Sequence, residues 1–99
     1  MTIEVLYFEG CPNHEPTVQL AREVVETLGL SLAISQVEVA GPEEAEALRF
    51  LGSPSVRVDG RDIEPGAGER TEFALSCRLY GDSGVPPREL LVAALEAYS

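Results

Sequence analysis

The stretch FEGCPNH at residues 8–14 separates a segment with strand periodicity from a segment with helical periodicity. Residues 2–8 are apolar on both faces, which is typical of a strand in the centre of a covered sheet. After the junction, apolar residues recur at helical spacing from Val18 to Leu28, and Gly29 follows where a glycine commonly ends a helix. The sequence therefore predicts a strand, a short junction and a helix that begins at residue 15 or 16.

The start of this helix has two interpretations. Pro12 fits the first helical position, but Pro16 would then lie awkwardly inside the helix. Alternatively, Asn13 is the N-cap and Pro16 falls at the third position, where its missing N–H costs nothing. In both cases Cys11 lies within about one turn of a helix N-terminus, where free N–H groups and the positive end of the helix favour a thiolate. Cys11 is therefore a candidate nucleophile or soft-metal ligand.

The rest of the chain alternates between extended and helical patterns. Pro42 and Pro87 each fit the first position of a helix, and Asp59-Gly60 is a strong two-residue hairpin signal. Residues 65–86 are rich in glycine and proline and give no clear pattern. The expected elements are a strand over residues 31–39, a helix over 42–51, hairpin strands over 55–58 and 61–64, and a helix over 87–98.

This order, strand–helix–strand–helix–hairpin–helix, predicts a single α/β domain over residues 1–99. The strand–helix–strand unit gives a parallel pair of strands, and the hairpin adds antiparallel neighbours. We therefore expect a four-stranded mixed sheet with helices on both faces, and an irregular segment over residues 65–86.

Composition limits the possible partners and location. The net charge is −10, from 17 acidic and 7 basic residues, and such a surface repels phosphate backbones and anionic lipids. No run approaches the roughly 20 apolar residues that a membrane-spanning helix needs, and the N-terminus does not resemble a secretory signal. We expect no nucleic-acid partner, no membrane partner and a cytoplasmic location.

The cysteine count also excludes some kinds of site. Cys11 and Cys77 are too few for a disulfide scaffold, and in a reducing cytosol they would normally stay thiols. His14 is the single histidine, so a closed structural zinc site is not expected. Motifs for nucleotide binding and serine hydrolysis are absent from the sequence, and we expect no resident metal or cofactor.

The order of elements, with Cys11-Pro12 after the first strand and Pro54 before the third, resembles the thioredoxin superfamily in its minimal, glutaredoxin-like form. The resemblance covers roughly residues 2–64 and the final helix, whereas residues 65–86 depart from it. Within that superfamily the chain is similar to small thioredoxin-like proteins, some of which carry an alkylmercury-lyase label. The motifs that carry this narrower similarity are GSPS at residues 52–55, VDGRD at 58–62 and CRLY at 77–80.

The resemblance implies roles for individual residues. Cys11 matches the nucleophilic cysteine, and Pro54 matches a proline that follows a cis peptide bond and lies beside that cysteine. Pro12, Ser53 and Pro54 are implied in substrate binding, since the backbone near such a proline is free to bind an extended peptide or a thiol. His14 stands where a dithiol enzyme has its resolving cysteine, so the motif is monothiol. His14 is either a catalytic group that stabilises the thiolate or donates a proton, or an exposed residue of the first helical turn.

Cys77 and Arg78 each have two interpretations. Cys77 is either a resolving thiol brought back to Cys11 or a buried structural cysteine. Arg78 either has a functional role, in which it lowers the pKa of the Cys77 thiol or binds an anionic substrate group, or pairs with surface acids. Asp59 and Asp62 flank the predicted hairpin and are expected to serve the turn and the solvent.

Three functions follow from these residues. The first is a thiol-dependent redox protein of the thiol–disulfide oxidoreductase kind, in which Cys11 attacks a protein or low-molecular-weight disulfide and Cys77 or an external thiol resolves the adduct. The second is a binding module whose thiolates hold a soft ion such as mercury or copper(I). The third is an interaction domain with the same fold and no catalysis.

Overall fold

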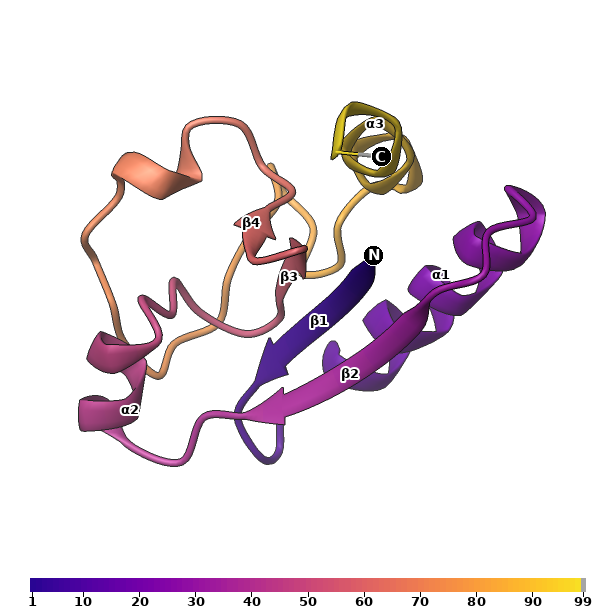
Figure 1. Ribbon diagram of the computed structural model, residues 1–99. Helices are drawn as coiled ribbons and strands as arrows, with labels where there is room; N and C mark the ends of the chain where they lie inside the picture. Colours follow the sequence, from indigo (N-terminus) through magenta and orange to yellow (C-terminus); the bar gives the residue numbers. More distant parts are fainter. Residues whose placement is uncertain (99) are drawn as a thin grey trace.

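The computed structural model describes residues 1–98 as an α/β fold around a four-stranded mixed sheet (Figure 1). The strands are ordered β2-β1-β3-β4. β1 pairs in parallel with β2 and antiparallel with β3, and β3 pairs antiparallel with β4. The strand bounds are Thr2–Tyr7 for β1, Ala33–Glu38 for β2, Ser55–Val58 for β3 and Arg61–Asp62 for β4. The mixed sheet and its parallel first pair confirm the α/β prediction.

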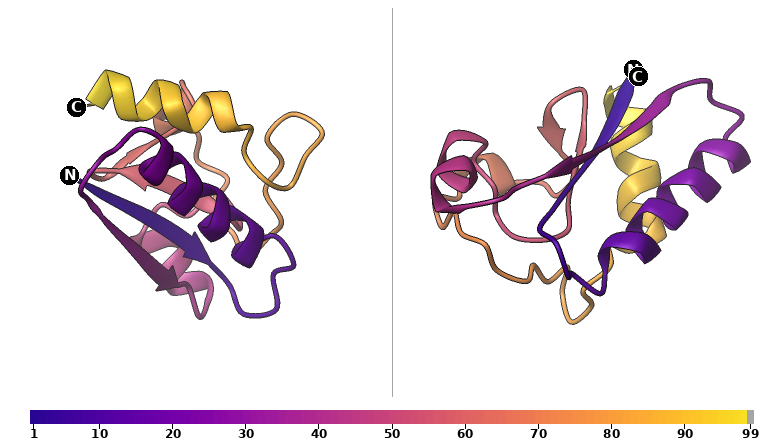
Figure 2. Two further views of the ribbon diagram at one scale, coloured as in Figure 1. Left: turned by 90° about the vertical axis from the view of Figure 1, so that its right-hand side faces the viewer. Right: turned by 90° about the horizontal axis from the view of Figure 1, so that it is seen from below.

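The helices cover both faces of the central strand β1, because its side chains alternate between two apolar clusters. Ile3 and Val5 belong to a large cluster with α1 (His14–Thr27) and α3 (Arg88–Tyr98), which lie on the same side of the sheet (Figure 2). Leu6 points the other way, into a smaller cluster beside α2 (Pro42–Ala47). This two-sided burial is the physical reason for the continuous apolar run in β1. No helix within residues 1–98 is long and apolar enough to cross a membrane.

The N-cap of α1 is Asn13, and Pro16 is the third helical residue, as in the second of the two predicted starts. The helix ends with a left-handed Gly29 at φ 66°. Gly29 N–H donates to Glu26 C=O and Leu30 N–H donates to Val25 C=O, which is the Schellman arrangement.

The second helix is shorter than predicted, because it ends at Ala47 and not at Leu51. Arg49 takes the left-handed conformation at φ 54°, and Phe50 N–H donates to the Ala45 carbonyl at 2.8 Å. This turn places the Phe50 ring in the smaller cluster, where it is fully buried. Leu51 is also buried, but it lies in an extended segment after the helix.

The hairpin turns at Asp59-Gly60 as predicted, and both residues have positive φ. The returning strand is only Arg61–Asp62, because Pro65 follows too closely for a longer ladder. Residues 65–86 contain a single 3₁₀ turn, Ala67–Glu69, and two isolated bridges, Ser53↔Cys77 and Tyr80↔Ser83. This segment crosses the molecule from β4 to α3 (Figure 1, orange).

Candidate functional site

Cys11 lies in the tight junction between β1 and α1. Its N–H donates to the Phe8 carbonyl at 3.2 Å, and its own carbonyl accepts the His14 N–H at 3.3 Å. The thiol is free, but only 9% of the residue is exposed, so the sulfur has limited contact with solvent. Cys11 therefore has the predicted place at the start of α1, with a narrow approach from solvent.

His14 is the first residue of α1, and its ring turns toward the sheet. The ring stacks on Tyr7, with centroids 3.6 Å apart and planes 5° apart. Nε2 lies 2.7 Å from Oε1 of Gln36 on β2, a hydrogen bond in which the amide oxygen accepts. The side chain is 13% exposed, so His14 is not the solvated first-turn residue that one interpretation expected. Its ring contacts join α1 to two strands.

The loop before β3 holds Ser53 and Pro54, both buried, with a cis peptide bond between them. This is the isomer that the resemblance implies for Pro54. Ser53 N–H donates to the Ser76 carbonyl at 2.7 Å, and the Ser53 carbonyl accepts the Arg78 N–H at 2.9 Å. The resemblance implies a free backbone at this place, whereas here the chain's own residues occupy it.

Cys77 pairs directly with Ser53 in this short parallel bridge, and its side chain is exposed. It is therefore not the buried structural cysteine of one interpretation. Within residues 1–98 both cysteines are free thiols. A resolving role for Cys77 stays a prediction.

The Arg78 guanidinium is buried among partners from the same sheet edge. Nη1 and Nη2 form two hydrogen bonds with the Asp62 carboxylate at 2.7 and 2.8 Å, and Nη2 donates to Glu64 at 3.0 Å. Nη1 also donates to the Ser55 hydroxyl, and Cζ lies 4.6 Å from the ring centroid of Tyr80. Only 1% of the Arg78 side chain is exposed. Arg78 therefore binds residues of the protein itself and does not face solvent as an anion-binding arginine would.

Arg78 and Tyr80 each keep one protonation state over the ordinary pH range. Burial alone lowers the pKa of Arg78, but hydrogen bonds and attraction from Asp62 outweigh that effect, so the pKa lies above its usual value. Burial raises the pKa of Tyr80, against an opposing effect of Arg78. Arg78 is therefore charged, and Tyr80 is a neutral phenol that donates to the Pro54 carbonyl at 2.7 Å.

Asp62, Glu64 and Tyr80 are the residues of this site that the sequence analysis did not identify. Asp62 is a partner of Arg78 and not only a turn residue, whereas the Asp59 carboxylate joins the hairpin turn to β1 by accepting the Thr2 N–H at 2.9 Å. The sequence signal for this site is the spacing of Asp62 and Glu64, because residues two apart in an extended segment place their carboxylates on the same face, where a basic side chain can bind both.

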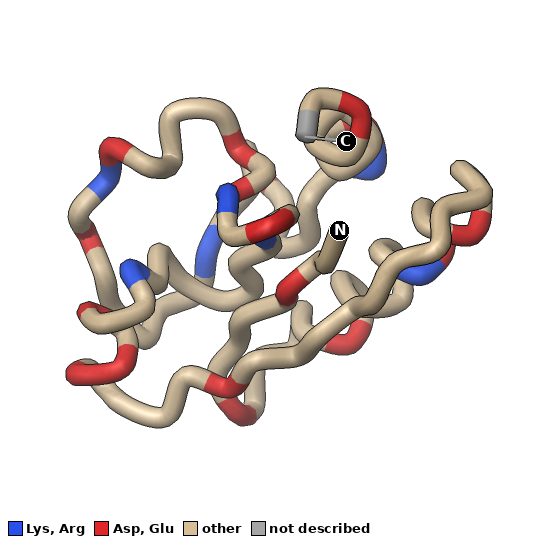
Figure 3. The backbone as a smooth tube through the Cα atoms, in the orientation of Figure 1, with Lys and Arg blue, Asp and Glu red and all other residues tan. Residues whose placement is uncertain are grey.

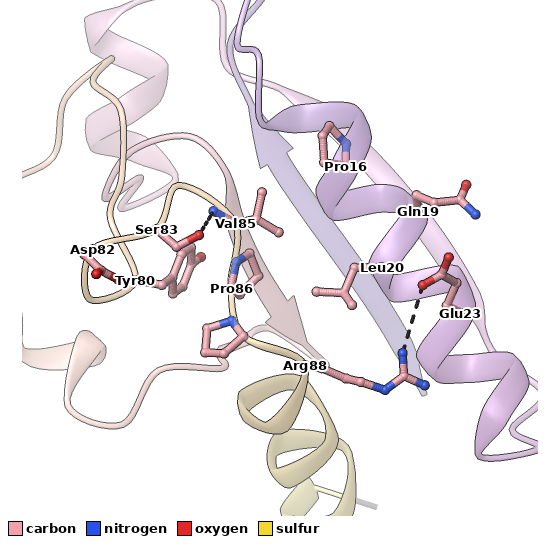
Figure 4. Close-up of a pocket in the computed structure, with 11 residues that line it drawn as sticks. Pro16, Gln19, Leu20, Glu23, Tyr80, Asp82, Ser83, Val85, Pro86 and Arg88 are labelled. Carbon is pink, nitrogen blue, oxygen red and sulfur yellow. Dashed lines mark hydrogen bonds and ion pairs between the residues drawn. The ribbon is translucent and has the colours of Figure 1, made fainter.

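The loop between β1 and α1 and the segment before α3 lie at the same end of the molecule (Figure 2). Gly84 lies so close to Asn13 that any side chain at Gly84 would collide with it. Near this end, a groove of about 670 Å³ runs between α1 and residues 80–88, with Pro16, Leu20 and Val85 among its lining residues (Figure 4). Neither cysteine lines the groove.

No group of three or more histidine, cysteine or acidic side chains within residues 1–98 is arranged to hold a metal ion. A comparison with models of known protein families finds no match, and no curated protein matches the chain in sequence.

Proposed function

We propose that the chain is a thiol-dependent redox protein of thioredoxin-like fold, in which Cys11 is the attacking thiol. The observation that carries the proposal is the position of Cys11, at the carboxyl end of the central strand β1 and directly before α1. β1 has a parallel neighbour on one side and an antiparallel neighbour on the other. Ligands of α/β sheets bind outside the carboxyl ends of the central strands, which is where this thiol lies.

The proposed reaction is thiol–disulfide exchange in two balanced steps. The Cys11 thiolate attacks one sulfur of a disulfide, a new S–S bond forms to Cys11, and the other half leaves as a thiolate. A second thiol then attacks the Cys11 sulfur and releases the bound half. If that thiol is Cys77, the protein becomes an intramolecular disulfide. If it is a low-molecular-weight thiol, Cys11 remains in a mixed disulfide that a further thiol reduces.

The test is intact-mass analysis after incubation with a small neutral disulfide, 2-hydroxyethyl disulfide. We expect Cys77→Ser to gain one adduct at Cys11. Wild-type protein then either loses the mass of two hydrogens, which identifies Cys77 as the resolving thiol, or keeps the adduct until an external thiol is added. Cys11→Ser is the control, and any adduct in it must lie on Cys77. Failure of Cys11 to form an adduct in folded protein would refute the proposal. Stoichiometric binding of mercury(II) in that case would favour the soft-ion module instead.

A further inference from the structure

Residues 74–80 form a strap, anchored at several points, across the loop that carries Ser53 and Pro54. Besides the two hydrogen bonds between Ser53 and residues 76 and 78, the Ala74 N–H donates to the Phe50 carbonyl at 3.2 Å. The strap also approaches Gly52 so closely that a Cβ there would lie 2.9 Å from the Ser76 carbonyl oxygen. Gly52, at φ 119°, therefore permits this pairing in two ways, through its conformation and through its missing side chain.

Side chains hold the strap from the other side. Arg78 reaches back to Asp62 and Glu64, and the Tyr80 hydroxyl donates to the Pro54 carbonyl. These contacts are buried or partly buried, and Arg78 and Tyr80 lie on the strap itself. The two buried side chains and the main-chain hydrogen bonds to Ser53 together hold the strap against the sheet in the folded protein.

From this arrangement we propose that the strap occupies the main-chain hydrogen-bonding groups of Ser53. Cys11 therefore reacts with small disulfides, and extended peptides are excluded. Extended peptides dock on sheet edges through main-chain hydrogen bonds. The antiparallel pairing of Leu6 with Ser55 directs Ser53 toward Phe8, whose carbonyl accepts the Cys11 N–H, and both main-chain groups of Ser53 already have partners in the strap. The 9% exposure of Cys11 has the same consequence, because it admits a small reagent more easily than a folded or extended polypeptide. The inference rests on the proposed function, and it names the substrate class of that site.

Charge narrows this class further. Glu9 and Glu15 flank Cys11 in sequence and are exposed, and residues 8–14 contain no lysine or arginine. Acidic positions predominate over the molecule, including the loop after β1 (Figure 3). An acidic surface lowers the local concentration of anionic reagents and raises that of cationic ones. The preferred substrates are therefore small neutral or cationic disulfides.

The test measures the rate of adduct formation at Cys11 in the Cys77→Ser background. The probes are 2-hydroxyethyl disulfide (neutral), cystamine (cationic), dithiodiglycolate (anionic) and a ten-residue extended peptide joined to mercaptoethanol by a disulfide. Each rate is divided by the rate of free N-acetylcysteine amide, an uncharged thiol, with the same probe, which removes differences in the intrinsic reactivity of the probes. We expect the normalised peptide rate to be at least about tenfold below that of the neutral probe, because the Ser53 backbone is occupied and the 9% exposed Cys11 admits a small reagent more easily than a polypeptide. Cystamine should react fastest and dithiodiglycolate slowest among the small probes, and this order should shrink in high salt.

Two variants loosen the strap. Gly52→Ala pushes the Ser76 carbonyl away, and Tyr80→Phe removes the bond to Pro54 while keeping the ring. In either variant, if it is folded, the normalised peptide rate should rise more than the rate of the neutral probe. Gly68→Ala is the matched control for Gly52→Ala, because the space around a Cβ at Gly68 is open. Equal normalised rates for peptide and neutral probe in the parent would overturn the inference and leave the proposed function intact. Failure of all four probes to react would refute the proposed function itself.

Discussion

Replacing Asp62 with asparagine should strongly destabilise the fold. The Asp62 carboxylate accepts two hydrogen bonds from the Arg78 guanidinium, at 2.7 and 2.8 Å. In the asparagine variant one of these acceptor oxygens becomes an NH₂ donor that faces an N–H donor. The guanidinium is 1% exposed and Asp62 is 12% exposed, so water can replace little of what is lost.

The size of the effect follows from this burial. Removing one partner of a buried ion pair costs about 3–5 kcal/mol. Glu64 remains 3.0 Å from Arg78, and its side chain is 30% exposed, so some compensation persists. We therefore expect Asp62→Asn to lower the free energy of unfolding by about 3 kcal/mol, the lower end of that range. A domain of this size has a total stability of about 5–15 kcal/mol, so the loss is a large fraction of it.

Urea unfolding followed by circular dichroism measures this change. Asp82→Asn makes the same chemical change at an exposed position of the segment before α3, and it should alter stability by less than about 0.5 kcal/mol. The double variant Asp62→Leu, Arg78→Met should recover much of the loss, since apolar pairs often replace buried ion pairs without cost. A loss below about 1 kcal/mol in Asp62→Asn would refute the view that this pair fastens the strap.

Three further predictions concern the contacts of the strap at Tyr80 and Gly52. Tyr80→Phe should lower the free energy of unfolding by about 1–3 kcal/mol, because the buried Pro54 carbonyl loses its partner, and urea unfolding checks this. The raised pKa of Tyr80 means that the unfolded chain ionises this phenol first, so stability should fall above about pH 10 by up to about 1.4 kcal/mol per pH unit. That part of the pH dependence should vanish in Tyr80→Phe, and identical slopes in the two proteins would contradict it. Gly52→Ala should cost more than about 2 kcal/mol, because a Cβ meets the Ser76 carbonyl at a positive φ. Gly68→Ala should be near neutral, and equal melting temperatures for the two glycine variants would argue against the close approach.

Local patterns in the sequence were sufficient to predict the first half of the fold. The apolar run of β1, the helical spacing of α1 and the glycine at residue 29 all act over a few residues, and each has its expected structure. The hairpin at Asp59-Gly60 is equally local. The predicted end of α2 was wrong, because the burial of Phe50 in the smaller cluster beside α2 outweighs the helical spacing of the sequence.

The strap could not be predicted, because its contacts are long-range and carry no periodic signal. Arg78 pairs with Asp62 across 16 residues, and Tyr80 reaches Pro54 across 26. An arginine is usually exposed, and only the three-dimensional proximity of two carboxylates makes the burial of Arg78 favourable. The position of Cys11 before α1 was predictable, whereas its low exposure depends on packing that the sequence does not encode locally.

The stability of the fold and the selectivity of Cys11 for small disulfides depend on the same side chains of the strap. Reaction of Cys11 in a folded variant with an opened strap must therefore be distinguished from reaction in unfolded chains. In unfolded chains Cys11 reacts like a free cysteine with any disulfide. If a protein with a stability of only about 5 kcal/mol lost 3 kcal/mol in Tyr80→Phe, about 3% of the chains would be unfolded. Unfolding could therefore raise the normalised peptide rate to no more than about 3% of the free-cysteine rate. A higher peptide rate in Tyr80→Phe must come from folded protein whose strap has opened, and a rate at or below that level would place the peptide barrier outside the strap.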